Sequence, residues 1–394
     1  MIALCALILL AGFAVALPAT WAARAFGHRL NALDGGGVAG QIKEAPRKVP
    51  NTGGIGIFLG VGLPLAAALL ALSTGVADRL SEQFQGLHAH LPGLIKRLPE
   101  AAALLAGILI LHIIGVIDDR RALGPYSKLI AMLFIAAAVI IITDTRLLEL
   151  LDHIPLGYWL SVALTVCWVV AITNAFNFLD NMDGLSGGVA AICGAALLAN
   201  ALVAQQWFVA AMLALTVGSL LGFLIFNFPW KRTGATVFMG DGGSLVVGFL
   251  LAFLSVRITW AGTTVATAAD GATISGAATG LGAPGWAVLT PLIVLAVPIY
   301  DFLSVTLIRL SQGRSPFVGD LQHFSHRLVR HGLSRRAAVL VIYGCTAVTG
   351  IGAIALPKLD GWQAALVGLQ TLLVLMVIAL YEWARTPPDV GTPL

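Results

Sequence analysis

The sequence predicts an all-α integral membrane protein that crosses the bilayer about eleven times. Of its 394 residues, 58% are hydrophobic and only 11% are charged, with a mean hydropathy of +0.92. A soluble protein carries about a quarter charged residues. The apolar residues gather into runs of about 20, the length that spans a bilayer as a helix. No loop between the runs accommodates a soluble domain, so 1–394 is interpreted as a single membrane domain.

The predicted spans follow one another along the whole chain. The first run is interpreted as a retained helix rather than a signal peptide, because no basic residue precedes it and Arg24 and Arg29 follow it. The predicted spans are residues 2–21, 53–74, 100–117, 127–143, 157–174, 185–204, 206–226, 242–260, 286–308, 337–356 and 362–383.

The distribution of basic residues predicts the orientation of these spans. With the N-terminus outside, 17 of the 23 Lys and Arg residues lie in inside segments, which is the bias expected of cytoplasmic loops. An odd number of spans then places the C-terminus in the cytoplasm. The loops expected to form an active site on this face are 22–52, 118–126, 174–184, 227–241 and 309–336.

Four unusual polar clusters fall on the inside face under this topology. They are GVIDDRRALG (with Asp118 and Asp119) after the third span, NAFNFLDNMDGLSGG between the fifth and sixth, VFMGDGGS (with Asp241) at the start of the eighth, and GRSPFVGDLQHFSHRLVRHGLSRR between the ninth and tenth. Unrelated polar residues would be scattered over both faces. Their gathering on one face predicts a single site at the membrane border.

The acidic residues of the first two clusters have a functional and a structural interpretation. Asp118 and Asp119 repel one another and are costly to bury unpaired. They either face a metal ion or phosphate, or form a solvated helix end beside two arginines. Asn177, Asp180 and Asp183 recur at three-residue steps, so in a helix they would lie along one face. The alternative is a polar helix terminus with Asp183 as a cap.

The third and fourth clusters contain residue types suited to anions. Asp241 stands among glycines, which allow close approach of a ligand, at a helix start, which favours anions; alternatively, it is a simple helix cap. Phe238 either stacks on a base or anchors the chain at the membrane interface. His323 and His326, with Arg327 beside them, can bind metal, donate to phosphate or shuttle a proton. The alternative is a solvated basic loop facing anionic lipid.

Together these residue types are typical of phosphoryl chemistry at a membrane border. Carboxylates bind Mg²⁺, which commonly bridges to phosphate oxygens. Cations neutralise the charge on a transferring phosphoryl group. A site at the border indicates one lipid reactant and one soluble reactant, but the residues alone do not identify a sugar.

The four clusters, in this order, resemble those of the polyprenyl-phosphate N-acetylhexosamine-1-phosphate transferases (the MraY/WecA superfamily, glycosyltransferase family 4). The resemblance extends from PRKVPNTGGIGI (46–57) to HRLVRHGLS (326–334), and NFLDNMDGLSGG together with FMGDGGS is its most specific part. It implies a UDP-N-acetylhexosamine donor, a polyprenyl phosphate acceptor, release of UMP, and Mg²⁺, for which Mn²⁺ can substitute. It also implies the bacterial inner membrane. No nucleic acid partner is expected, and a homodimer is left open.

The resemblance implies catalytic roles for the three acids nearest the expected metal. Asp241 is the expected Mg²⁺ ligand, together with Asp118. Asp118 and Asp119 are expected near the polyprenyl phosphate, where one of them deprotonates it so that its oxygen attacks the β-phosphorus of the donor directly. A covalent aspartyl-phosphate intermediate is the alternative.

The resemblance also implies roles for the remaining site residues. Asn177, Asp180 and Asp183 match the nucleotide-sugar and catalytic stretch, and His323 and His326 are kept in the catalytic site. Phe238 is expected to stack on uracil. Lys48, Lys128 and Arg327 are the other residues expected to contact the nucleotide sugar or its phosphates.

The fourth cluster favours the branch that transfers GlcNAc-1-phosphate. GRSPFVGDLQHFSHRL is similar to the pattern of that branch, although Ser325 stands where it often has a middle His. Eleven spans also suit this branch better than ten. The predicted product, polyprenyl-diphospho-GlcNAc, would prime a cell-surface glycan. One alternative is transfer of phospho-MurNAc-pentapeptide. A transporter is the alternative from another class, but its acids would lie near the membrane midplane.

Overall fold

The structure, a computed structural model, is helical almost throughout. It describes residues 1–33, 47–77, 91–230, 234–259, 266–267, 273–274, 285–316 and 321–384. Within these ranges the only strands are the two-residue β1 (Ala266–Thr267) and β2 (Thr273–Ile274), which pair antiparallel. Ten helices of the described chain are long and apolar enough to cross a membrane. The prediction of an all-α, multi-pass membrane protein is therefore confirmed at this level, while the number of crossings and their orientation stay predictions.

Most helix boundaries lie within about three residues of the apolar runs, but the first helix continues to Arg29 rather than ending at 21, and the helix that begins at Gly157 continues to Leu179 rather than ending at 174. The ten long helices are α1 (Ile2–Arg29), α2 (Gly53–Ser73), α6 (Leu98–Arg120), α7 (Pro125–Thr143), α8 (Gly157–Leu179), α9 (Leu185–Val203), α10 (Trp207–Asn227), α11 (Asp241–Thr259), α15 (Arg335–Ile354) and α16 (Gly361–Ala384). The shorter ones are α5 (Leu91–Lys96), η1 (Glu149–His153), η2 (Gly285–Leu289), α12 (Thr290–Val294), α13 (Ala296–Ser311), α14 (Phe324–Arg330) and η3 (Leu356–Lys358).

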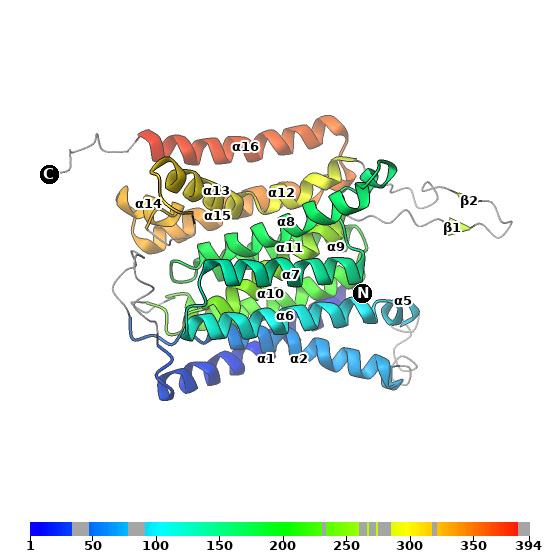
Figure 1. Cartoon of the computed structure of the whole chain (residues 1–394), viewed down its shortest axis with the longest axis horizontal. Coiled ribbons are helices and arrows are strands. Elements are labelled where there is room, and N and C mark those ends of the chain that lie inside the picture. Colours follow the sequence, from blue (N-terminus) through cyan, green and yellow to red (C-terminus); the bar gives the residue numbers. More distant parts are fainter. Residues whose placement is uncertain are drawn as a thin grey trace.

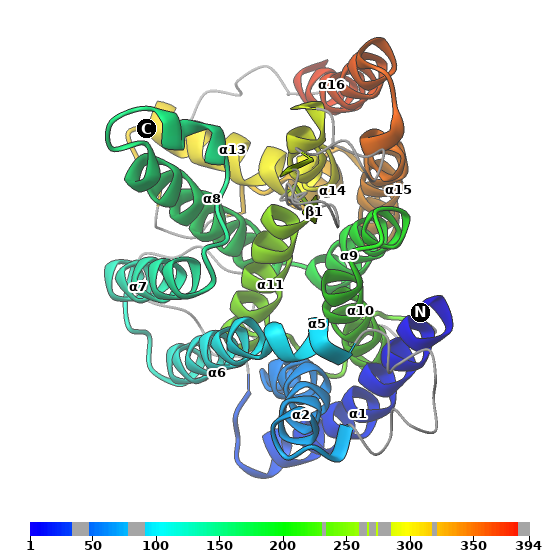
Figure 2. The ribbon, with the colours of Figure 1, turned by 90° about the vertical axis from the view of Figure 1, so that its right-hand side faces the viewer.

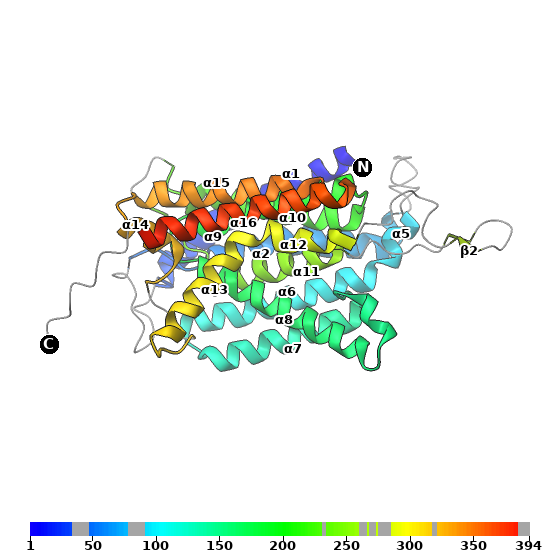
Figure 3. The same cartoon turned by 90° about the horizontal axis from the view of Figure 1, so that it is seen from above.

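The ninth predicted span, 286–308, is not one continuous helix. It is divided into η2, α12 and α13, and Leu295 separates the last two. Proline has no N–H to donate, so Pro298 cannot bond the carbonyl of Val294, and a new helix begins at Ala296. In Figure 3, α13 diverges from the direction of the long helices. The apolar run was recognised correctly, but its hydropathy did not reveal the break.

The long helices form one bundle with α11 in its middle. Figure 1 shows them running side by side, and Figure 2 looks along the bundle. α11 packs against α2, α6, α8 and α9 and is buried along nearly its whole length. Only a small share of the residues of α1 and α16 is buried, as expected of helices that face lipid. The residue that opens α11 is therefore placed at the centre of one end of the bundle.

Glycines allow the helices to approach closely at this end. A Cβ on Gly115 of α6 would lie 2.4 Å from the backbone of Asp241 and Gly242. A Cβ on Gly54 of α2 would lie 2.3 Å from the backbone nitrogen of Gly243. Small residues commonly permit such contacts between membrane helices. The start of α11 is thus enclosed by α6 and α2 at backbone distance.

Candidate active site

The centre of the site is an ammonium group held between two carboxylates. A short turn, with Gly124 at φ +83°, joins α6 to α7 and places the first turn of α7 beside the last turn of α6. Lys128 Nζ donates to Asp118 Oδ2 at 3.0 Å and also to Asp241 Oδ2. Asp118 Oδ1 accepts from the Leu123 N–H at 2.7 Å, which closes the turn. Three predicted site residues from α6, α7 and α11 therefore meet.

Asn177 joins this centre from the end of α8. Its Nδ2 donates to Asp241 Oδ1 at 2.7 Å and to Ser244 Oγ at 2.9 Å. Asp241 thus has one oxygen on Lys128 and the other on Asn177. The Asn177 amide therefore fixes the orientation of the Asp241 carboxylate at the N-terminus of α11.

Asp119 binds the N-terminus of α11. Its Oδ1 accepts from the Asp241 N–H at 3.0 Å and its Oδ2 from the Gly242 N–H at 3.2 Å. Asn51 Nδ2 adds a third hydrogen bond, to Oδ1, at 2.7 Å. Helix N-termini favour anions through their unpaired N–H groups and their dipole. Asp119 therefore locks α6 to α11 as a carboxylate, whereas its neighbour Asp118 faces the ammonium group.

Asp180 is an acid with too little positive charge around it. It follows the last residue of α8 and lies beyond the helix end. Burial, and then the negative charges of Asp241 and Asp119, raise its pKa to about 8; an N–H bond from Gly240 acts in the opposite direction. Its side chain is partly accessible, so the crowding of acids contributes beside the loss of water. A cation near Asp180 would favour its ionised form.

A second ion pair lies beside this centre. Arg47 NH1 donates to Asp183 Oδ2 at 2.8 Å, and NH2 contacts Oδ1 in a bidentate pair. The Ala235 N–H donates to the same Oδ2 at 2.8 Å. The Arg47 guanidinium also lies over the Phe238 ring, 4.6 Å from its centroid. The aromatic face predicted to stack on uracil is thus covered by Arg47, while the neighbouring Lys48 is exposed.

Asn177, Asp180 and Asp183 do not share one helical face. Asn177 belongs to α8, but Asp180 and Asp183 lie in the turn between α8 and α9. Gly184, at φ +79°, precedes α9, so Asp183 is not its cap. The expected three-residue register was wrong because the helix ends at Leu179. The turn instead directs the residues to different partners, Asn177 to Asp241 and Asp183 to Arg47.

The fourth cluster reaches the same region through α14. His323 Nδ1 lies 2.9 Å from Asp301 Oδ2 of α13, and the Phe324 N–H donates to Asp301 Oδ1 at 2.6 Å. Asp301 is fully buried. The carboxylate only accepts, so Nδ1 carries the proton and Nε2 of a neutral ring is left as an acceptor. The edge of His323 packs on Phe178, which follows Asn177 in α8.

The rest of α14 is buried against its neighbours. Ser325 Oγ donates to Asn181 Oδ1 at 2.5 Å, which ties α14 to the turn after α8. His326 is buried in the same helix. Arg327 Nε donates to Glu382 of α16 at 2.7 Å and NH2 to Ser304 of α13 at 2.8 Å. Arg327 therefore joins three helices, and its predicted contact with an anionic ligand stays a prediction.

The described residues contain no ready-made group of three or more His, Cys, Asp and Glu side chains for a metal ion. The donors are nevertheless of the type that Mg²⁺ prefers, namely carboxylate and amide oxygens. Asp118 and Asp241 have the Lys128 ammonium between them, where a cation is electrostatically favoured. Asp180 has the raised pKa of a site deficient in positive charge. These are the residues that could hold a divalent cation.

Four residues of the candidate site were not predicted from the sequence. Arg47 and Asn51 lie within the motif PRKVPNTGG, where only Lys48 was selected. Asp301 and Asn181 were hidden, the first in an apolar run and the second among more prominent acids. A polar residue inside the run 286–308 was the available signal for Asp301, because buried carboxylates require partners.

Comparison with known proteins shows the family of this chain. The profile of "Glycosyl transferase family 4" matches residues 101–259, which carry the α6, α8 and α11 parts of the site. A "Probable undecaprenyl-phosphate N-acetylglucosaminyl 1-phosphate transferase" of Bacillus subtilis is 28% identical over 84% of this chain and 80% of its own length. A "Decaprenyl-phosphate N-acetylglucosaminephosphotransferase" of Mycolicibacterium smegmatis is 30% identical over 86% and 80%. The "Undecaprenyl-phosphate alpha-N-acetylglucosaminyl 1-phosphate transferase" of Escherichia coli K12 is 28% identical over 66% of each chain.

The apolar helix bundle and the similarity to these relatives define a membrane-embedded transferase, and its acidic centre lies at one end of the bundle. The chain belongs to glycosyl transferase family 4, on the side of its GlcNAc-1-phosphate transferases. The resemblance inferred from the four polar clusters is thereby confirmed.

Proposed function

We propose that the protein transfers GlcNAc-1-phosphate from UDP-GlcNAc to undecaprenyl phosphate and releases UMP. The observation that carries this proposal is the Asp118–Lys128–Asp241 centre at one end of the bundle. The chain belongs to a family whose relatives are named as GlcNAc-1-phosphate transferases acting on undecaprenyl or decaprenyl phosphate. The product would prime a cell-surface glycan.

Asp241 and Asp118 are the proposed Mg²⁺ ligands, with Asp180 beside them. Their oxygens suit Mg²⁺ or Mn²⁺, and Lys128 now supplies part of the charge they need. When bound, the ion would neutralise charge on the diphosphate. Lys128 would then be released to bind a phosphate oxygen, as predicted. Asn177 would keep Asp241 oriented throughout.

The chemistry is a direct displacement at the β-phosphorus. An oxygen of the lipid phosphate forms the new bond while the bond from the β-phosphorus to the bridging oxygen breaks, and UMP leaves with that oxygen. Both oxygens of Asp119 already accept hydrogen bonds, from the Asp241 and Gly242 N–H groups and from Asn51, so this carboxylate is engaged in holding α6 to α11. Asp118 is therefore the proposed proton acceptor of the pair. This assignment disfavours a covalent intermediate on Asp119.

The nucleotide half of the donor is proposed to bind beside Asp183. Uracil would replace the Arg47 guanidinium on the face of Phe238. Arg47 would turn toward the diphosphate, which a guanidinium binds in a bidentate manner, with Lys48 nearby. Asp183 would retain the Ala235 N–H and so keep this wall of the site in place.

The site is proposed to face the cytoplasm of a bacterium. A soluble nucleotide sugar is then available on one side and the lipid phosphate within the inner membrane. This orientation places the N-terminus outside and the C-terminus inside. It requires the broken segment from η2 to α13 to serve as an eleventh crossing. A homodimer stays a prediction.

Purified protein with undecaprenyl phosphate, Mg²⁺ and radiolabelled UDP-GlcNAc tests the function. We expect label in the organic phase and UMP in the aqueous phase. Asp241→Asn should lower turnover by about a thousandfold because an oriented charge in the site is lost. Asp360→Asn, at the other end of the bundle, is the matched control. EDTA should stop the reaction, and Mg²⁺ or Mn²⁺ should restore it.

Donor exchange separates the alternatives. Transfer from UDP-MurNAc-pentapeptide but not from UDP-GlcNAc would change only the identity of the transferred sugar and would leave the proposed reaction in place. Absence of transfer from every UDP-HexNAc donor, in protein whose helicity and melting are normal, would contradict the enzyme proposal. Activity that survives thorough chelation would contradict the proposed role of the metal.

A further inference from the structure

A large apolar cavity lies at the end of the bundle opposite the candidate active site. Its volume is about 1010 Å³, the upper end of the usual range for ligand pockets. It is lined by the first turns of α6 and α10 and by the last turns of α9 and α11, with parts of α1 and α2. α11 connects the two sites, because Asp241 begins it and Arg257 near its other end lines the cavity.

Small and branched side chains leave this space open. α2 lines the cavity only from Pro64 onward. A proline in a helix interior removes one hydrogen bond and favours a bend, and Figure 1 shows the end of α2 diverging from α6. Beyond the bend, Ala68 presents only a methyl group to the cavity. The residues that line the cavity are mostly apolar, and burial of apolar surface is favourable, so the cavity suits an apolar occupant.

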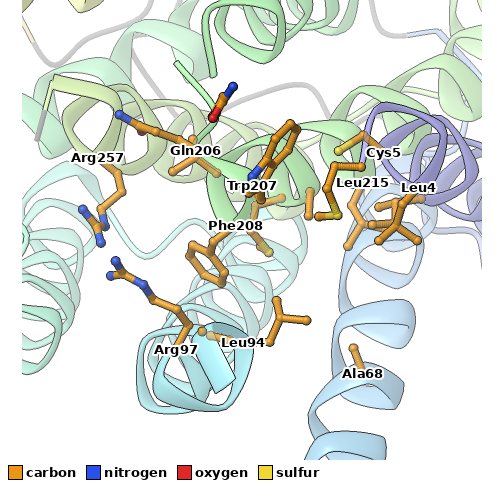
Figure 4. A pocket seen from close by; sticks show the side chains of 18 of the residues that line it. Leu4, Cys5, Ala68, Leu94, Arg97, Gln206, Trp207, Phe208, Leu215 and Arg257 are labelled. Carbon is orange, nitrogen blue, oxygen red and sulfur yellow. The ribbon is translucent and has the colours of Figure 1, made fainter. Parts of the chain in front are cut away.

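The charged side chains among the described lining residues are all basic, namely Arg97, Arg257 and Lys358. Arg97 NH1 and Arg257 Nε donate to the two oxygens of Glu100 at 2.8 and 2.9 Å. Glu149 also attracts Arg257. The three basic side chains therefore outnumber these two glutamates. Figure 4 shows Arg97 and Arg257 together at one side of the cavity, away from Leu4 and Leu215.

We propose that this cavity binds an anionic phospholipid of the bilayer, with phosphatidylglycerol as the matching chemistry. An acyl chain would fill the aliphatic part, and the headgroup phosphate would contact Arg97 and Lys358. The position agrees with this occupant, because the ends of spanning helices lie at the depth of lipid headgroups. The binding site lies a helix length from the acidic centre and is independent of the proposed transfer reaction.

Native mass spectrometry of the purified full-length protein tests the proposal. Detergent-solubilised protein is titrated with phosphatidylglycerol, phosphatidylethanolamine or undecaprenyl phosphate, and the first bound lipid is quantified. We expect tightest retention of phosphatidylglycerol. Lys358→Gln or Arg97→Gln should weaken it about fivefold per charge removed, and Arg97→Lys should restore most of the binding.

A cavity-filling pair of variants separates specific binding from lipid adhering to the surface. Ala68→Phe should lower retention about tenfold by occupying chain space. Ala67→Phe adds the same ring at the neighbouring position, which is also exposed but does not line the cavity, and should have no effect. Equal loss in both variants, equal retention of the two phospholipids, or tighter retention of undecaprenyl phosphate that Ala68→Phe abolishes would each overturn the proposal. Asp241→Asn should lose turnover and still bind phosphatidylglycerol normally. Lipid binding and transferase activity are therefore tested separately, and the failure of one proposal can be distinguished from the failure of the other.

Discussion

Individual side chains in the site differ in how fully their charge is compensated. Asp119 has three N–H donors, and Asp183 has a bidentate arginine with a backbone N–H. Asp241 shares one ammonium group with Asp118. Burial and the charges of Asp241 and Asp119 raise the pKa of Asp180, in the turn after α8, to about 8. The structurally committed acids and those available to a ligand can thus be distinguished by their partners.

Asp180→Asn is expected to separate stability from activity. The folded pKa of about 8 lies above the ordinary carboxyl value of 3.8, so ionisation opposes folding. The cost begins above the ordinary value and is complete above about pH 8. In metal-free detergent, Asn should therefore raise the melting temperature more at pH 8.5 than at pH 5, as scanning fluorimetry can measure. Turnover should fall about a hundredfold. A lower melting temperature at pH 8.5 would contradict this interpretation.

Asp301→Asn is expected to reverse the tautomer of His323. The asparagine oxygen would remain with the Phe324 N–H, and its NH₂ group would donate to His323 Nδ1, so Nε2 would become the protonated nitrogen. We expect kcat to fall about 10- to 100-fold, with KM for UDP-GlcNAc nearly unchanged and a normal melting temperature. A loss confined to KM or to folding would show that Asp301 does not act by positioning His323.

At the scale of elements, three helix ends determine the site. The last turn of α6, the end of α8 and the first residue of α11 converge because glycines permit backbone contact between α6 and α11. The turn between α6 and α7 adds Lys128. α14 is joined to the turn after α8 by the Ser325–Asn181 bond. Small changes in helix spacing should therefore disrupt the chemistry before they unfold the bundle.

Gly115→Ala is expected to separate α6 from α11. The added methyl group would meet backbone of Asp241 at 2.4 Å, which no side-chain motion can relieve. We expect a stability loss of about 1–3 kcal/mol and a larger loss of activity, because Asp119 would no longer reach the start of α11. Gly107→Ala on the same helix is the control, since its Cβ would meet a side-chain methyl of Val139 at 3.1 Å. Equal effects of both variants, measured by thermal melting and turnover, would refute this explanation.

The whole molecule has two different ends joined by the buried α11. One end gathers acids, and the other encloses the apolar cavity with its basic residues. In the predicted orientation the acidic end is cytoplasmic, where the site would meet a soluble nucleotide sugar. The two ends should therefore be accessible from opposite sides of the membrane.

Single cysteines introduced into a Cys-free variant test this orientation. Arg121→Cys, at the exposed end of α6, should react with a membrane-impermeant maleimide only after the inner face is opened. Asp360→Cys, exposed at the other end, should react in intact spheroplasts. The reverse pattern would invert the topology. Labelling of both positions in intact cells would contradict a single orientation.

The sequence by itself determined the membrane class, nearly all helix boundaries and the polar clusters of the site. Hydropathy is a local property, and ten of the eleven predicted spans correspond to long helices. The break at Leu295 was missed because it depends on one absent N–H inside an apolar run. The partners of the acids were decided only by the tertiary structure, since Arg47 and Asp183 are 136 residues apart. Such pairs depend on how the helices pack and rotate, which no local pattern of residues specifies.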